Sequence, residues 1–591
     1  MATWLIATPV AVLVPRLIDF SPFTVRGGFV PIAAGAVLLA AMTAVAWWPR
    51  AGERVVAMAA ALFAAWVALA LQVALNGTPF GFSGMGGDMG RMAATVNRYT
   101  VAPWPTDTFV EGLPPEYPPL YPWLISRAAL VAGEPAWRVL PVAEIVVTSF
   151  AVLAGYLMWR RLIPGGAALA CGVGLLVFGY PQKAFAIVAL FVFVPWLIAT
   201  FTDPPRGRLH WLPAGLIGGL IVLTYHGWFP FGAFGVLAIL VAAWRRADDR
   251  GRYLRHVLGV AAVAFVVASP YVVPFGYALL TRDSQPLGDL YQTSELLDNA
   301  LPFLTPTLLG ALQLVGLAGL VWYRQRTWWA WPLLYLVAGS YVFWALMGLR
   351  YVLTEHTLLI HYVPRLTGVA LATAGVLTLV FAAPALARRL GVTAPYRFGA
   401  AALVVAMAWI GTVYWQDWRP RQTLGEAGDV IRPADYSTLA HLDALPDCSY
   451  PRYKPPDLGS GCLPVDRIMD AVESTRGEGA RPVTLSFTEK LFAFQPLRGY
   501  AGVDRTSAGS LVNWDDRLAE LTRLAAISDP REFATESANT RFGPIDAFVL
   551  ARSGDDLEAL GLRFHESQFD PATWRIVDDL DEPFVVAVRR P

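Results

Sequence analysis

The stretch RFGAAALVVAMAWIGTVYW, residues 397–415, is the last of a series of apolar runs that starts near the N-terminus. The series contains about 13 runs of roughly 15–24 residues, near the length that an α-helix needs to cross a bilayer. Of the 591 residues, 55% are hydrophobic and 15% are charged, which is too apolar for a soluble protein of this size. The sequence therefore predicts a multi-span α-helical membrane domain over 1–415 and a soluble domain over 416–591.

The predicted spans are 3–18, 29–48, 55–75, 137–159, 165–180, 184–201, 211–225, 229–244, 256–279, 303–323, 328–348, 363–384 and 397–415. The N-terminus lacks a basic segment and a small-residue cleavage site, so the first run is interpreted as a span and not as a cleaved signal.

Basic residues favour alternate loops between these spans. The loops that carry them contain Arg50 and Arg54, Arg160 and Arg161, Arg206 and Arg208, RRADDRGRYLRH, Arg324 and Arg326, and Arg388, Arg389 and Arg397. Such loops face the cytoplasm in most membrane proteins. The soluble domain is therefore expected on the extracytoplasmic side, with four outer segments: a long first external loop at 76–136, and 225–228, 281–302 and 350–365. Within the long loop, LYPWLISRAAL is expected to form a short amphipathic helix at the interface.

The tail reads as a mixed α/β domain. The β-like runs are PVTLSF, DAFVLA, TWRIV and PFVVAV, and the helical stretches are WDDRLAELTRLAAI and DDLEALG. Cys448 and Cys462 lie in this domain, where an oxidising compartment favours a disulfide over the alternative of two unpaired thiols. Cys171 falls inside a predicted span and is expected to serve packing.

Asp88 is the first candidate for chemistry. It lies in GGDMGR at the outer surface, where flanking glycines let a ligand approach the backbone. A carboxylate there can act as a general base on an acceptor hydroxyl, or hold a cation. It can equally cap the helix that MGRMAATVNRY predicts, and both interpretations stay open.

GLPPEYPPLYPW, residues 112–123, supplies further candidates in the same loop. Its prolines hold the chain stiff. Asp107 and Glu116 are candidates for a secondary acid or base, whereas Glu111 fits a solvated loop better. Tyr117, Tyr121 and Trp123 can stack on a sugar or belong to the aromatic belt of the membrane.

A phosphate-bearing donor needs cationic or N–H partners. The outer-face candidates are Arg91, Lys183, His226, Arg350, His356, His361 and Arg365. Ionisable groups near membrane depth are costly and usually functional, although the group at 350–365 can also simply anchor a helix.

Other classes of function lack support. The formal net charge of +1 indicates no nucleic-acid partner. No Walker-type loop, no dinucleotide glycine pattern and no zinc-type Cys/His spacing occurs, so a cytosolic nucleotide-driven pump and a sugar-nucleotide enzyme are disfavoured.

The combination of many spans, a long first external loop with an early carboxylate and an external C-terminal domain resembles the GT-C class of glycosyltransferases. GLPPEYPPLYPW resembles the GLPPxYPPxWxW loop of the actinobacterial arabinofuranosyltransferase family that primes galactan. GGDMGRMAATVNRYT resembles the segment of that family that carries its carboxylate, which falls on Asp88, and Asp107 also matches. LSFTEKLFAFQPLRGYAG, FGPIDAFVLAR and FDPATWRIVDDLDEPFVVAVRR resemble its C-terminal domain.

The resemblance implies an inverting transfer of arabinofuranose from decaprenyl-phosphoryl arabinofuranose to a hydroxyl of lipid-linked galactan in the cell wall, at the outer face of the plasma membrane. It makes Asp88 the base and the outer cations the partners of the lipid phosphate, with no cofactor required and a divalent cation admitted. It also implies that the soluble domain helps hold the glycan, with Phe492, Phe494, Tyr500 and Trp514 as candidate contacts.

Two departures bear on the sugar. Glu116 stands where the family pattern has an aromatic residue, and Leu120-Tyr121-Pro122 replaces a Gly-Trp-Phe-like stretch. Two alternatives remain beside the transferase. One is a transporter or flippase of a lipid-linked glycan, and the other is a non-catalytic scaffold that binds cell-wall polymer.

Overall fold

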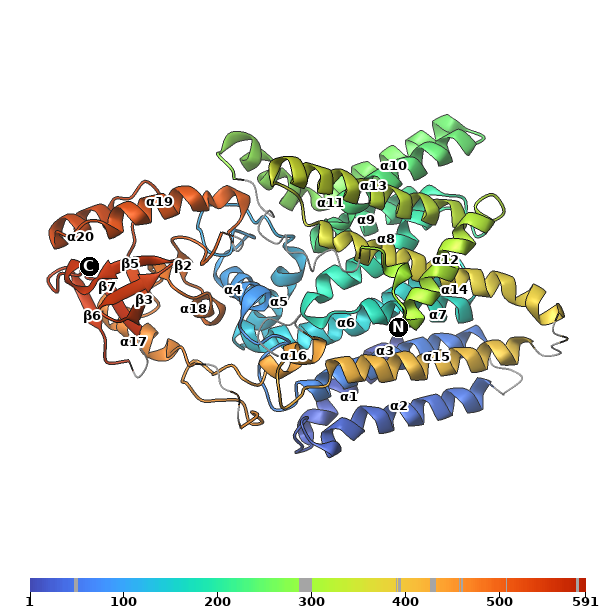
Figure 1. Cartoon of the computed structure of the whole chain (residues 1–591), viewed down its shortest axis with the longest axis horizontal. Helices are drawn as coiled ribbons and strands as arrows, with labels where there is room; N and C mark the ends of the chain where they lie inside the picture. Colours follow the sequence, from blue (N-terminus) through green and yellow to red (C-terminus); the bar gives the residue numbers. More distant parts are fainter. Residues whose placement is uncertain are drawn as a thin grey trace.

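The computed structural model describes residues 1–46, 52–285, 300–389, 391, 395–425, 432–456, 458, 461–505, 508–580 and 584–591. It has a helical part and a sheet-containing part, with the sheet at the left of Figure 1 and the long helices at the right. The chain between α3 and α6 lies where the two parts meet (Figure 1).

The helices of the first part follow the predicted spans. They are α1 Ala2–Leu17, α2 Val25–Ala46, α3 Glu53–Ala74, α4 Gly87–Val101, α5 Leu120–Ala132, α6 Ala136–Arg160, α7 Gly165–Leu175, α8 Ala184–Phe201, α9 Trp211–Tyr225, α10 Trp228–Arg246, α11 Arg250–Thr281, α12 Leu308–Tyr323, α13 Ala330–Thr354, α14 Val363–Arg389 and α15 Pro395–Trp418. Short 3₁₀ turns η2 Pro181–Lys183 and η6 Ile360–Tyr362 precede α8 and α14.

Each of the thirteen predicted spans contains a helix in the described ranges. Helicity alone does not establish that all thirteen cross the membrane. Within those ranges, nine helices are long and apolar enough to cross a membrane. Four other predicted spans, α1, α7, α9 and α12, are helices of 16, 11, 15 and 16 residues. At 1.5 Å per residue, even 16 residues reach only about 24 Å of a hydrocarbon core of about 30 Å.

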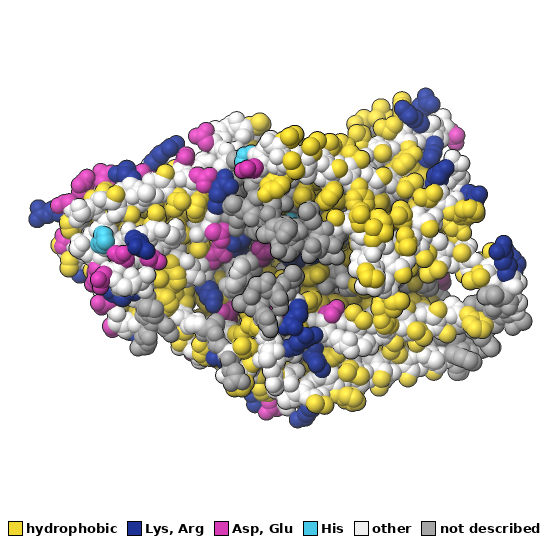
Figure 2. All heavy atoms as spheres, viewed as in Figure 1, with side chains coloured by type: hydrophobic (Ala, Val, Ile, Leu, Met, Phe, Trp, Pro, Cys, Tyr) yellow, Lys and Arg dark blue, Asp and Glu magenta, His cyan; other side chains and the backbone are white. Residues whose placement is uncertain are grey.

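The outer faces of the long helices are apolar. Hydrophobic side chains cover the right-hand part of the molecule in Figure 2, whereas charged side chains gather over the sheet-containing part. On α11, for example, Val266 and Leu280 are 69% and 88% exposed. A membrane covers such a surface, because a water-exposed apolar face of this extent is unfavourable.

The segment 76–136 is not a loop throughout. It holds α4 and α5, and α5 coincides with the expected helix over LYPWLISRAAL. Two glycines shape the entry to α4: Gly84 in the preceding turn and Gly87, the first residue of the helix, have φ of +66° and +53°, values that residues other than glycine rarely adopt.

The second part is built on one seven-stranded sheet. Its strands are β1 Val483–Ser486, β2 Arg498–Gly499, β3 Ala547–Ser553, β4 Asp556–Ala559, β5 Leu562–His565, β6 Trp574–Val577 and β7 Phe584–Arg589. The path β2-β1-β3-β4-β5 is extended by β7, which pairs with β3 and β6. The strand β1 is parallel to β2 and β3, and the other pairs are antiparallel. The helices of this part are α16 Pro433–Leu439, α17 Val465–Arg476, α18 Lys490–Phe494, α19 Trp514–Ala525 and α20 Pro530–Ala538.

The four predicted strand runs are confirmed as β1, β3, β6 and β7, and WDDRLAELTRLAAI forms α19. DDLEALG was expected to be helical, and that prediction is wrong because it forms β4. Leu557 and Ala559 are buried while their neighbours are less so, which is the two-residue period of a strand. The turn to β5 uses Leu560 and Gly561 at positive φ.

Cys448 and Cys462 form a disulfide with a Cα–Cα distance of 5.4 Å, and Cys171 is a buried thiol. The bond closes a loop with a sequence separation of 14, and removing it is expected to destabilise the soluble part by about 3 kcal/mol through the freed unfolded chain. The measurement is thermal unfolding of wild type and of Cys448→Ser/Cys462→Ser. Reductant should lower the transition of the wild type and leave that of the variant unchanged; an equal shift in both would show that the bond does not stabilise this part.

Candidate active site

Asp88 lies in the first turn of α4, one residue after Gly87. The N-cap of the helix is Gly86, and no side chain caps it, so the alternative interpretation of Asp88 as the helix cap is wrong. Its side chain is 54% exposed. A carboxylate in this position gains from the helix dipole and stays accessible to a substrate.

Lys183 is the main partner of Asp88. Its Nζ lies 2.7 Å from Asp88 Oδ2 and donates to the Tyr362 hydroxyl at 2.8 Å. Burial raises the pKa of Asp88, but Lys183, Arg91 and His361 together outweigh burial and hold the pKa below its usual value. Asp88 is therefore ionised at neutral pH, and its charge is matched by a cation from a different segment of the chain.

Arg365 and His361 lie beside the Asp88–Lys183 pair. The Arg365 guanidinium lies over the rings of Tyr180 and Tyr362, 4.5 and 5.6 Å from their centroids. His361 Nδ1 is buried and has no hydrogen-bond partner among the described residues. Asp88, Lys183, His361 and Arg365, predicted separately from three outer segments, are thus brought together by the fold, and we name them the transfer centre.

Tyrosines around the transfer centre were missed by sequence reasoning. Tyr180, Tyr225, Tyr362 and Tyr436 all lie near these charges, and the Tyr225 and Tyr362 rings are 6.0 Å apart. Their phenol groups provide hydroxyls for a sugar or phosphate in an apolar frame. A signal existed, because Tyr180, Tyr225 and Tyr362 each stand at the outer end of a predicted span.

Arg91 is held by the soluble domain. Its guanidinium donates to both carboxylate oxygens of Glu489, at 3.0 and 3.1 Å, and to Asp504 at 3.0 Å, and lies 3.6 Å from Asp88. Three carboxylates already neutralise this arginine, so the geometry does not favour the expected role as a donor-phosphate ligand. It favours a positioning role for α4.

Further contacts fix the start of α4 to the same domain. Asp443 accepts a hydrogen bond from the Met85 backbone N–H and forms an ion pair with Lys490. Ser83 N–H donates to the Tyr436 carbonyl at 2.7 Å. The base candidate is thus placed by the membrane part on one side and by the tail on the other.

Asp107 and Glu116 lie apart from this arrangement. Asp107 is buried and accepts from the backbone N–H groups of Phe109 and Val110 at 3.0 and 2.8 Å, while Glu116 accepts from the backbone N–H and the hydroxyl of Ser510. Burial raises the pKa of both carboxyl groups. Their oxygens already bind the protein's own donors, which favours structural roles.

Glu116→Gln is expected to keep transfer within about twofold of wild type, because the amide oxygen still accepts from Ser510. Burial raises the pKa of Glu116 above its ordinary 4.5, so ionisation costs folding free energy as pH rises through the raised value. The variant should match wild-type stability below pH 4.5 and exceed it at higher pH. Thermal unfolding at several pH values checks this, and loss of transfer in Glu116→Gln would contradict the structural role.

The three aromatic candidates lie in different surroundings. The Tyr117 ring is 45% exposed and lies 6.4 Å from the Tyr225 ring, at the edge of the transfer centre. Tyr121 is buried, with its ring 5.3 Å from that of Phe185. Trp123 lies under the Arg127 guanidinium at 5.8 Å. Of the three, Tyr117 is placed to contact a substrate.

Three cationic candidates are placed differently from Lys183. His226 lies 3.3 Å from the Tyr271 hydroxyl, and burial lowers its pKa, so it is neutral at physiological pH. Arg350 lies in the last turns of α13 and His356 just beyond its end, and both are exposed. Neither is among the groups that lower the pKa of Asp88, which are Lys183, Arg91 and His361.

The expected glycan contacts in the soluble domain are mostly core. Phe492, Phe494 and Tyr500 are 2%, 6% and 1% exposed, and the Trp514 indole donates to the Gly502 carbonyl at 3.0 Å. Phe494 is nevertheless one wall of a cavity of about 490 Å³ between α4–α6 and the soluble domain.

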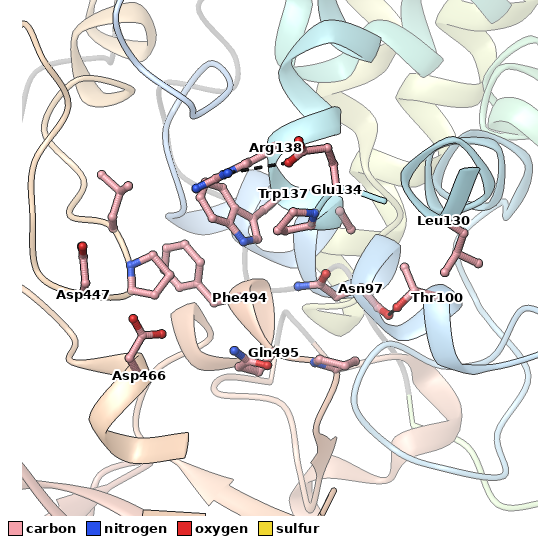
Figure 3. A pocket seen from close by; sticks show the side chains of 15 residues that line it. Asn97, Thr100, Leu130, Glu134, Trp137, Arg138, Asp447, Asp466, Phe494 and Gln495 are labelled. Carbon is pink, nitrogen blue, oxygen red and sulfur yellow. Dashed lines mark hydrogen bonds and ion pairs between the residues drawn. The ribbon is translucent and has the colours of Figure 1, made fainter. Parts of the chain in front are cut away.

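Polar side chains surround this cavity (Figure 3). Asn97, Glu134, Asp447, Asp466 and Gln495 line it, beside Trp137 and Arg138. The mixture of carboxylates, amides and a few aromatic faces is typical of a surface that binds sugar hydroxyls. We name it the interdomain cavity.

Within the described residues, no three side chains of the His, Cys, Asp and Glu types come together as metal ligands. The divalent cation that the sequence admits beside Asp88 stays a prediction, and Lys183 and Arg91 lie next to this carboxylate.

Comparison with known proteins identifies the relatives of this chain. Residues 19–413 match the family model of the arabinofuranosyltransferase N-terminal region. The galactan 5-O-arabinofuranosyltransferases of Mycobacterium tuberculosis (strain H37Rv) and Mycolicibacterium smegmatis are each 25% identical, over 90% and 92% of this chain and 84% and 88% of theirs. The solved apo structure of ArnT from Cupriavidus metallidurans is 15% identical, with a TM-score of 0.49 over 89% of this chain and 97% of that one. The chain therefore belongs to the arabinofuranosyltransferase family and is a membrane glycosyltransferase.

Proposed function

We propose that this enzyme transfers arabinofuranose from a polyprenyl-phosphoryl donor, decaprenyl-phosphoryl arabinofuranose, to a hydroxyl of galactan. The observation that carries the proposal is the pairing of the accessible Asp88 carboxylate with Lys183, next to Arg365. The names of the relatives support the sugar and the acceptor.

The charges of the transfer centre suit a phosphate leaving group. As the bond from the sugar C1 to the phosphate oxygen breaks, negative charge grows on the departing lipid phosphate. Fixed cations placed where charge develops lower the barrier, and Lys183 and Arg365 take this role. Because these residues and the tyrosines supply the stabilisation, no cofactor is required for the step.

The same geometry couples donor binding to activation of the base. In the free enzyme Lys183 neutralises Asp88 and lowers its pKa, which makes the carboxylate a weak base. A donor phosphate competes for Lys183, so Asp88 regains basicity only when the donor is present.

Transfer then proceeds by a single displacement with inversion. The acceptor hydroxyl oxygen attacks C1, its proton passes to Asp88, and the C1–O bond electrons leave with the lipid phosphate. The acceptor chain extends into the interdomain cavity. Its wall residue Asn97 lies nine positions after Asp88 on α4, about 14 Å along the axis.

The enzyme works at the outer face of the plasma membrane in this proposal, with the soluble domain extracytoplasmic. The disulfide supports that side, because such bonds persist in oxidising compartments.

The test is transfer of radiolabelled pentose from the polyprenyl-phosphoryl donor to a synthetic galactan fragment by purified full-length enzyme, with the new anomeric configuration read by NMR. Labelled product with inverted configuration is expected. Retention would overturn the single displacement. Movement of labelled lipid across a vesicle without product would favour the flippase, and glycan binding without either would favour the scaffold.

A further inference from the structure

A second cavity, of about 990 Å³, lies where the chain after α4 faces the outer end of α11 and the soluble domain. Four arginines from different segments line it: Arg98, Arg282, Arg481 and Arg498. Glu111 is the one carboxylate among its lining residues, so the lining carries a formal charge of +3 (4 − 1). We name it the arginine cavity. Its lining includes no member of the transfer centre.

The positive charge in the arginine cavity is only partly compensated. Glu111 accepts from Arg98 at 3.3 Å and from Arg498 at 3.0 Å. Arg98 is only 5% exposed, and its Nε has no hydrogen-bond partner in the part of the chain that the structure describes. Burial, reinforced by the neighbouring Arg481 and Arg498, lowers the pKa of Arg98. A buried guanidinium with an unused donor and like-charged neighbours favours an added anion.

The opposite rim of the cavity is apolar and faces the membrane side. Trp104 and Tyr277 are 73% and 69% exposed. Tyr277 belongs to α11, one of the helices long enough to cross the membrane, and Leu280 beyond it is 88% exposed. Aromatic side chains of this kind settle at the headgroup level of a bilayer.

We propose that the arginine cavity binds the phosphate headgroup of a membrane lipid, whose chain leaves along the exposed face of α11. Guanidinium groups bind phosphate oxygens in pairs, and the apolar rim accounts for the lipid. A free phosphate ion would fill little of a space of about 990 Å³ and would gain nothing from Trp104 and Tyr277. The site is separate from the Lys183–Arg365 pair and goes beyond the proposed transfer.

The test measures binding of phosphatidic acid to the full-length protein by native mass spectrometry. Arg481→Gln/Arg498→Gln is expected to weaken binding by roughly tenfold or more, since each lost charge-assisted bond costs about that factor. Arg481→Lys/Arg498→Lys should recover part of it, which separates charge from misfolding. The matched control is Arg531→Gln/Arg563→Gln, two exposed arginines of the soluble domain, and it should bind as wild type does.

Three further arms decide the source of the anion and the place of binding. Diacylglycerol, which lacks the phosphate, should not bind, and inorganic phosphate should not displace the lipid. Lys183→Met should bind phosphatidic acid as wild type does. Displacement by inorganic phosphate would turn the cavity into a free-anion site. Loss of binding in Lys183→Met, or equal binding by the glutamine variant, would overturn the proposal, whether or not the enzyme proves to transfer arabinofuranose.

Discussion

Asp88→Asn is expected to lower the rate of pentose transfer by roughly 10²–10⁴-fold, the usual contribution of a general base. The amide keeps the size of the side chain and can still accept from Lys183, but it cannot take the proton of the acceptor hydroxyl. Donor binding should be retained and somewhat tighter, because Lys183 and Arg365 remain and the Asp88 charge no longer competes with the phosphate for Lys183. Single-turnover transfer with saturating donor measures the chemical step separately from binding.

Asp555→Asn is the matched control. Asp555 is an exposed aspartate in the turn before β4, and its replacement should leave the rate unchanged. Asp88→Glu should restore part of the activity, since the carboxylate returns at a shifted position. A rate for Asp88→Asn within a few fold of wild type, with the fold intact, would remove Asp88 as the base. Another group of the transfer centre would then have to be the base, because the carboxylates of Asp107 and Glu116 are already hydrogen-bonded to the protein.

Lys183→Met is expected to have the second large effect, a loss of roughly 10²–10³-fold in transfer, because a preorganised charge at the leaving oxygen disappears. The pH dependence should change in a defined direction. Lys183 is the largest of the groups that hold the pKa of Asp88 down against burial, so its removal raises that pKa. The acid limb of the pH–rate profile should therefore move to higher pH.

The sequence contains a suitable control for this change. Lys183 is one of three lysines, and Lys454 lies over the Tyr450 ring, outside the transfer centre. Lys454→Met should transfer at the wild-type rate, and Lys183→Arg should retain part of the activity because the charge persists in a different shape. A Lys183→Met profile with an unmoved acid limb would show that Lys183 does not set the ionisation of the base.

Much of the helical part was predictable, because long apolar runs bounded by charged loops have few other solutions in a bilayer. The limits appear in short elements. The DDLEALG run has helix-forming residues, yet its two buried positions pair with neighbouring strands, so tertiary contacts overrode local propensity. In α7 and α9 the apolar run is real, but the helix within it is too short to establish a crossing.

The candidate site was predictable as a set of residues and not as a geometry. Asp88, Lys183 and Arg365 were each identified as outer-face groups, and no spacing rule links positions so far apart. Arg91 was grouped with the phosphate ligands because its partners, Glu489 and Asp504, lie in another domain. A charge without visible partners in the sequence looks free for a ligand until the fold supplies them.

The contacts between the C-terminal domain and α4 affect when a newly synthesised enzyme can become active. Arg91 and Glu489 are separated by 398 positions, and a ribosome that adds roughly 5–20 residues per second needs about 20–80 s between them. During this interval the membrane helices can insert, but the helix that carries Asp88 lacks its anchors. A newly made chain is therefore expected to stay inactive until its last domain has folded against α4, so synthesis itself delays activity.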